Sequence, residues 1–141
     1  MSVSDDQLAV MRTVSEYCRR CDDGRFDDFT RLFAGDAQLV VRGQVTAGAE
    51  AIGAVIAALQ TPERRGRHMV ANTVVEISGD RASAESDFVF FRPRSDGTLE
   101  AVNTGRYLDE FVRDGDGWQF SRREIVLAET PNAPEREADQ R

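Results

Sequence analysis

The chain has 141 residues, of which 40% are hydrophobic and 30% are charged, and its formal net charge is -7. These values are typical of one globular domain with its own core, and they exclude a collagen-like, coiled-coil or wholly unfolded chain. The acidic balance disfavours a general binder of nucleic-acid backbones or of anionic membranes, since such binders need an excess of Lys and Arg.

No segment approaches the roughly 20 apolar residues of a membrane span, and the first residues lack the layout of a secretion signal. We therefore expect a cytoplasmic protein. The cysteines Cys18 and Cys21 have the spacing of a redox or metal-binding pair, but the chain holds a single histidine and no further cysteine. Two buried thiols on one helix face are the favoured interpretation.

The first half of the chain has the periodicity of helices. Ser4-Asp5-Asp6-Gln7 has the pattern of a capping box and predicts a helix from Ser4 to about Asp22. Apolar residues then recur at steps of three and four, and this face ends at Asp22. The next predicted elements are a helix over 25–34, a strand over 37–42, a turn over 43–48 and a helix over 49–60.

The second half is rich in β-branched and aromatic residues separated by turn sequences. It predicts four strands, over 68–77, 82–92, 99–112 and 118–127. Because the connections are short and glycine-containing, we expect hairpins and a curved, antiparallel sheet. Helices followed by strands predict an α+β domain over residues 1–128. Residues 129–141 are polar and proline-containing, which predicts a disordered tail.

An aspartate and a histidine do not fit the apolar patterns around them. Asp22 ends the apolar face of the first helix, and His68 opens the first long strand. A carboxylate on an apolar face is costly without a partner, and imidazole is a partner that exchanges protons near neutral pH. If the two meet, Asp22 fixes the tautomer of His68, which serves as a general base. The alternative is that Asp22 caps the turn at Gly24 and His68 is an ordinary strand residue.

The order and spacing of several segments resemble the SnoaL-like branch of the nuclear transport factor 2-like superfamily. The resemblance extends from about residue 5 to residue 128. It rests on YCRRCDDGRFDDFTRLF (17–33), RHMVANTVVEISGD (67–80), GRYLDEFVRDGDGW (105–118) and then Arg122 or Arg123. It implies an α+β fold shaped like a cone, with the helices packed on a strongly curved, mostly antiparallel sheet.

The resemblance also implies a chemistry. Scytalone dehydratase and hexachlorocyclohexane dehydrochlorinase look closest, with an Asp and a His at positions that match Asp22 and His68. Such enzymes remove a proton and expel a leaving group from a small hydrophobic molecule, with no metal or organic cofactor. Cys21 replaces the tyrosine of scytalone dehydratase, and its second strand histidine is absent here, so the scytalone reaction itself is not implied.

Further candidates for the pocket come from strand alternation. Strict alternation places His68, Val70, Asn72 and Val74 on one face of their strand, and Asn103 and Tyr107 on one face of another. The expected substrate-binding residues are Tyr17, Asn72, Phe88, Asn103 and Tyr107. For each of them an ordinary role in the sheet or core is the alternative.

Two functions follow from these observations. The first is a cofactor-independent acid–base enzyme of the dehydratase, isomerase or cyclase type, acting on a small hydrophobic molecule. The second is a non-catalytic binding or assembly module of the same fold. Either protein is expected to form a homodimer or a higher homo-oligomer through its open sheet, and neither is expected to bind nucleic acid or a membrane.

Overall fold

The computed structural model describes residues 2–128, so the predicted disorder of 129–141 lies outside the described residues. Within residues 2–128, helices occur only in the first half of the chain, where they are interspersed with two strands, and the second half consists of strands. In order they are α1 (Val3–Asp22), α2 (Phe26–Thr30), β1 (Phe33–Val41), β2 (Gln44–Ala47), α3 (Ala49–Leu59), a 3-10 turn (Pro62–Arg64), β3 (Arg67–Ser78), β4 (Arg81–Pro93), β5 (Leu99–Asp114) and β6 (Gly117–Leu127).

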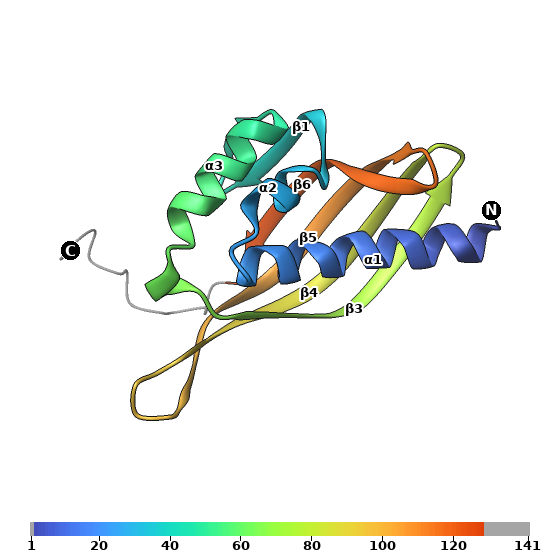
Figure 1. Cartoon of the computed structure of the whole chain (residues 1–141). Helices are drawn as coiled ribbons and strands as arrows, with labels where there is room; N and C mark the ends of the chain where they lie inside the picture. Colours follow the sequence, from blue (N-terminus) through green and yellow to red (C-terminus); the bar gives the residue numbers. More distant parts are fainter. Residues whose placement is uncertain (1, 129–141) are drawn as a thin grey trace.

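The strands form one curved sheet in the order β2-β1-β6-β5-β4-β3. Neighbouring strands are antiparallel, except that β1 runs parallel to β6. Figure 1 shows α1 lying across one face of this sheet, with α2 and α3 beside β1. The predicted α+β class, the three hairpins of the second half and the mostly antiparallel sheet are therefore confirmed. None of the helices over residues 2–128 has the length and apolar character needed to cross a membrane.

The first helix begins earlier than predicted. Its N-cap is Ser2 rather than Ser4, because Asp5 can complete the capping box as well as Gln7 could. The Ser2 hydroxyl accepts the Asp5 N–H, and the Asp5 carboxylate accepts the Ser2 N–H, each over 3.1 Å. The earlier start adds a part-turn to α1 at the end far from Asp22.

The segment between α1 and α3 also differs from the prediction. The helix expected over 25–34 ends at Thr30, because Phe33 pairs with Phe120 of β6 and already belongs to β1. The turn expected over 43–48 is the strand β2 instead. Only Arg42 and Gly43 turn, with φ of 52° and 76°, and such a two-residue turn is typical of a hairpin between β1 and β2.

A bulge in β3 changes the faces predicted by strict alternation. The register with β4 shifts between Ala71 and Val74, and Asn72 has a φ of 57°. Asn72 consequently points away from α1, where its amide donates to the Asp87 carboxylate over 2.8 Å, and Val74 is also exposed. The inner face of β3 instead continues through Thr73, whose hydroxyl lies 3.0 Å from that of Ser86.

The core between α1 and the sheet is aromatic, with one ion pair at its centre. Arg123 has an exposed fraction of 0% and binds the Asp109 carboxylate through Nε and Nη2, at 2.7 and 2.8 Å. The rings of Tyr17 and Tyr107 lie 4.1 and 3.7 Å from its guanidinium carbon. Burial raises the pKa of Asp109, and the Arg123 guanidinium opposes this rise.

Removing one member of this pair should cost more than removing both. We expect Arg123→Met to lower the free energy of unfolding by about 3–5 kcal/mol, because it leaves a buried carboxylate without its partner. Without the guanidinium that opposes the rise, the pKa of Asp109 in the folded variant should be higher still, so this loss should grow as the pH rises above the ordinary carboxyl value of about 3.9. Urea unfolding followed by the fluorescence of Trp118 measures it. The double variant Asp109→Leu/Arg123→Met should recover most of the loss, and a single variant no less stable than the double one would contradict the account.

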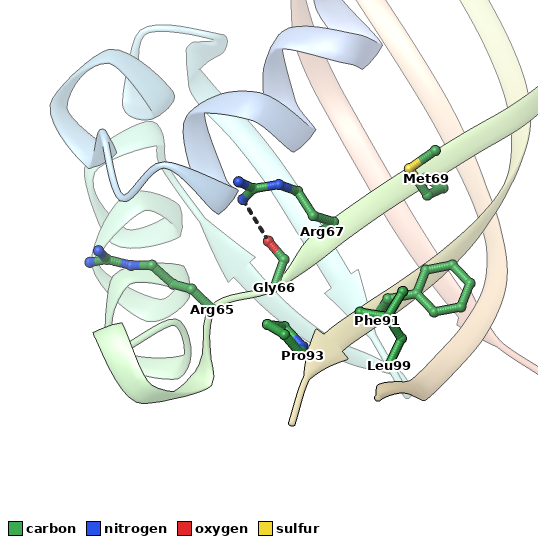
Figure 2. Close-up of a pocket in the computed structure, with 7 residues that line it drawn as sticks. All are labelled: Arg65, Gly66, Arg67, Met69, Phe91, Pro93 and Leu99. Atoms are coloured by element: carbon green, nitrogen blue, oxygen red, sulfur yellow. Dashed lines mark hydrogen bonds between the residues drawn. The ribbon is translucent and has the colours of Figure 1, made fainter. Parts of the chain in front are cut away.

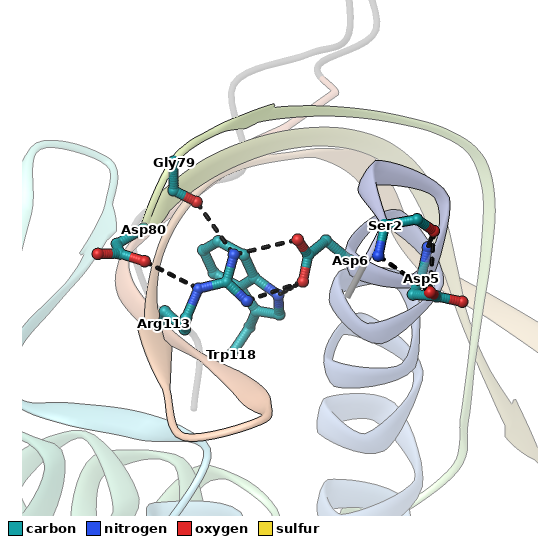
Figure 3. A network of polar contacts seen from close by, with 7 residues as sticks. All are labelled: Ser2, Asp5, Asp6, Gly79, Asp80, Arg113 and Trp118. Carbon is teal, nitrogen blue, oxygen red and sulfur yellow. Dashed lines mark hydrogen bonds and ion pairs between the residues drawn. The ribbon is translucent and has the colours of Figure 1, made fainter.

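A second ion pair fixes the N-terminal end of α1 to the sheet. Arg113 of β5 donates to both carboxylate oxygens of Asp6, at 2.9 and 3.0 Å, and to Asp80 in the turn before β4 (Figure 3). Its guanidinium carbon also lies 4.5 Å from the ring of Trp118, whose indole N–H donates to Asp6. The hydrogen bond from Arg113 lowers the pKa of Asp6.

This contact should make part of the stability depend on pH. A carboxyl group whose pKa is lowered by folding stabilises the native state above its unfolded value of about 3.9, and the contribution disappears as the pH falls below that value. We therefore expect Asp6→Asn to unfold at lower urea concentration than the parent at pH 7, with the difference shrinking below pH 4. Asp27→Asn, the same charge change at an exposed position, is the control and should show neither effect.

Candidate functional site

The structure brings together the two residues that the sequence singled out. Asp22 is the last residue of α1 and His68 the second residue of β3, so the site lies where the helix ends over the edge strand. Asp22 Oδ1 lies 2.6 Å from His68 Nδ1, and Asp22 Oδ2 accepts the backbone N–H of His68 over 2.8 Å. The two side chains have exposed fractions of only 5% and 10%. The alternative in which Asp22 merely caps a turn does not describe this geometry.

The hydrogen bonds define what the imidazole can do. An ionised carboxylate only accepts hydrogen bonds, so with a neutral ring this contact selects the tautomer that has the proton on Nδ1 and the lone pair on Nε2. No residue between 2 and 128 forms a hydrogen bond with Nε2. The Asp22 carboxylate and the C-terminal end of α1 both favour positive charge at this point, which stabilises an imidazolium once Nε2 has taken up a proton. The pair therefore has the arrangement of a general base and its orienting acid.

Two side chains on neighbouring strands share the inner face with His68. Register places His68 beside Phe90 of β4 and Phe90 beside Asn103 of β5. The ring centroids of His68 and Phe90 are 4.4 Å apart with a tilt of 30°, so Phe90 supports the imidazole on one side. Asn103 is exposed at the end of this row, which leaves its amide free for a ligand. The predicted role of Asn103 stays a prediction.

Cys21 adds a thiol to the pair. The ligand atoms of Cys21, Asp22 and His68 lie within 4.8 Å of one another, a set that could hold a thiophilic metal such as Zn²⁺ if the Asp22–His68 hydrogen bond opened. Burial raises the pKa of the Cys21 thiol to about 12, and that of Cys18 likewise to about 12. Both cysteines are free and buried, as the sequence predicted, and protonated thiols are poor metal ligands.

The other predicted pocket residues divide into two groups. Tyr17, Phe88 and Tyr107 lie in the core, where Phe88 stacks on Tyr107 at 4.3 Å and Tyr17 meets the edge of Tyr107 at 5.9 Å. Their contact with a substrate stays a prediction. Asn72 was assigned to the wrong face of β3, because the bulge turns its side chain outward to Asp87.

A cavity of about 460 Å³ lies on the opposite face of β3 from His68. Figure 2 shows its lining, which is mostly apolar: Arg65, Gly66, Arg67, Met69, Phe91, Pro93 and Leu99. Arg67 and Met69 flank His68 in the strand and therefore point away from the pair. The cavity lies at the same end of the sheet as His68, with the sheet between them.

Sequence reasoning missed the arginines near the pair. Arg65 precedes β3, and Arg92 lies near the end of β4, two residues from Phe90. The sequence feature that could have revealed these arginines is a pair of short basic runs in a chain with an acidic net charge, ERRGRH (63–68) and FRPR (91–94). Composition over the whole chain averages such local clusters away.

Comparison with known proteins supports the fold described above. The model of the SnoaL-like domain family matches residues 2–124. An uncharacterised protein of Mycobacterium tuberculosis is 30% identical over 123 residues, which cover 84% of this chain and 82% of the relative.

Two solved structures from Novosphingobium aromaticivorans are also similar. One is a nuclear transport factor 2-like protein with a cystatin-like fold, with a TM-score of 0.80 and 26% identity, covering 92% of this chain and 86% of the other. The second is a proposed scytalone dehydratase, with a TM-score of 0.75 and 20% identity, covering 92% and 89%. At this identity the second likeness concerns the fold alone.

Proposed function

The chain belongs to the SnoaL-like family, and we propose that it is an enzyme in which His68 removes a proton from a small, largely apolar substrate. The observation that carries this proposal is the double hydrogen bond between Asp22 and His68, which holds the imidazole with Nε2 unused. The match to the SnoaL-like domain family supports the fold in which this chemistry is proposed. No metal or organic cofactor is needed for such chemistry, and we propose none.

The proposed reaction begins with transfer of a proton from carbon to His68 Nε2. The electron pair of the broken C–H bond moves into the substrate, either forming an enolate or forming a C=C bond as a leaving group departs, and the imidazolium is stabilised by Asp22. In an elimination, the imidazolium returns its proton to the departing hydroxyl group, which leaves as water. In an isomerisation, the same proton returns to another carbon. Proton removal is therefore the step common to the dehydratase, isomerase and cyclase reactions considered.

The common step can be measured before the natural substrate is known. In D₂O, an enzyme of this kind should exchange the acidic C–H protons of a suitable ketone or hydroxyketone for deuterium, which NMR detects. We expect His68→Gln to slow this exchange by about 10²- to 10⁴-fold, the usual contribution of a general base. Asp22→Asn should also slow it, because an amide no longer selects the Nδ1–H tautomer.

Glu76→Gln, an exposed change further along β3, is the matched control and should exchange at the parent rate. Thermal unfolding of all three variants excludes loss of the fold as the cause. Parent-like exchange by a folded His68→Gln variant would contradict the proposal.

The second candidate is a non-catalytic binding module. It is favoured by the dense packing of Tyr17, Phe88 and Tyr107, which fills the centre of the domain with protein side chains. This function would be favoured if a broad set of carbon acids shifted the NMR signals of His68 and none of them exchanged its C–H protons for deuterium.

A further inference from the structure

Arginines without an acidic partner gather at the end of the sheet where the Asp22–His68 pair lies, on both of its faces. Arg64, Arg65, Arg67 and Arg92 form no salt bridge with any residue between 2 and 128, whereas Arg20, Arg106, Arg113 and Arg123 each do. The four lie together, because Arg67 starts β3 opposite Phe91 and Arg92 Nε donates to the carbonyl of Arg64 over 3.1 Å. Figure 2 shows Arg65 and Arg67 projecting from either side of Gly66. In a chain of net charge -7, this is a local excess of positive charge.

Two of these arginines are held in the same way. Arg92 donates through Nε to the Arg64 carbonyl and lies over the ring of Phe90, with 5.6 Å from the guanidinium carbon to the ring centroid. Arg65 donates through Nε to the Gln60 carbonyl over 3.1 Å and lies over Phe26 at 5.7 Å.

This arrangement fixes each guanidinium and leaves its terminal nitrogens free. Nη1 and Nη2 of Arg65 and Arg92 form no hydrogen bond with the described residues. Nη1 and Nη2 can bind a carboxylate together, as those of Arg113 bind Asp6, and a side chain that is already ordered loses less entropy when it does so.

Both arginines adjoin the proposed site. The centroid of the Phe90 ring lies 4.4 Å from that of the His68 ring and 5.6 Å from the guanidinium carbon of Arg92. The proposed base and the arginine therefore contact the same aromatic side chain. Arg92 lies two residues beyond Phe90 in β4 and hence on the same, inner face. On the other side, the guanidinium of Arg65 occupies the space where a Cβ of Gly24 would lie, two residues after Asp22.

We propose that the site takes an anionic substrate: a small molecule with an apolar body beside Phe90 and one carboxylate that pairs with Arg92, with Arg65 as a second cation. The apolar body follows from the aromatic face, and the single carboxylate from unpaired guanidinium groups in an otherwise acidic protein. A polyanion such as nucleic acid is disfavoured by the net charge of -7. That the bound molecule is a substrate rests on the proposed function, whereas the preference for a carboxylate can be tested by binding alone.

The single histidine makes the binding test specific. His68 supplies the one imidazole signal of the chain, so its NMR resonances report on ligands at this site without assignment of other residues. The probes are three carboxylates, benzoate, cinnamate and 2-naphthoate, each compared with its neutral primary amide at pH 7.5. We expect at least one carboxylate to shift the His68 signals and to bind about tenfold more tightly than its amide, a difference that should fall as salt is added.

Arg92→Gln should weaken the carboxylate to the affinity of its amide and leave the amide unchanged, and Arg65→Gln should have a smaller effect in the same direction. Arg81→Gln, which removes another unpaired arginine at the far end of β4, is the control and should bind both probes as the parent does. The proposal is overturned if no carboxylate shifts the His68 signals, if amides bind as tightly as acids, or if Arg92→Gln weakens both equally. Failure of the catalytic proposal would appear instead as tight, Arg92-dependent carboxylate binding without proton exchange.

Discussion

Asp22 uses both of its carboxylate oxygens on His68, one for the backbone N–H and one for the ring. This double contact fastens the C-terminal end of α1 to the start of β3, the edge strand of the sheet. The proposed chemistry depends on it as well, because a carboxylate that only accepts hydrogen bonds selects one tautomer of a neutral imidazole. The proposed base, its orientation and the position of the helix over the sheet therefore depend on one interaction.

The opposite end of α1 is fixed by a comparable contact. Asp6 binds Arg113 on β5, and the Arg123–Asp109 pair lies between the two ends, enclosed by aromatic rings. Charged groups buried without a partner would oppose folding, so each of these acids requires its base in one position. A helix held at both ends gives the Asp22–His68 pair a rigid support, as catalytic groups require.

Sequence patterns were sufficient to predict the fold and the proposed pair, because helical periodicity, strand composition and a carboxylate on an apolar helix face can each be recognised in a short segment. They were insufficient where contacts between distant segments determine the local structure. The bulge at Asn72 depends on a left-handed residue that strict alternation cannot foresee, and it reversed the predicted face of that side chain. Phe33 joins a strand instead of a helix because β6 offers a partner 87 positions later, at Phe120. Arg65 and Arg92 belong to separate segments, and only folding places Arg92 over Phe90 and Arg65 against Gly24.

The most direct test of the account is the tautomer of His68, read from its two imidazole nitrogens by ¹⁵N NMR at a pH where the ring is neutral. The account predicts that Nδ1 carries the proton and Nε2 does not, and that Asp22→Ala abolishes this preference while the chain stays folded. A parent protein with the proton on Nε2, or with the two tautomers averaged as in a free imidazole, would contradict it. Asp22 would then not orient His68, and the site would lack the base on which the proposed function depends.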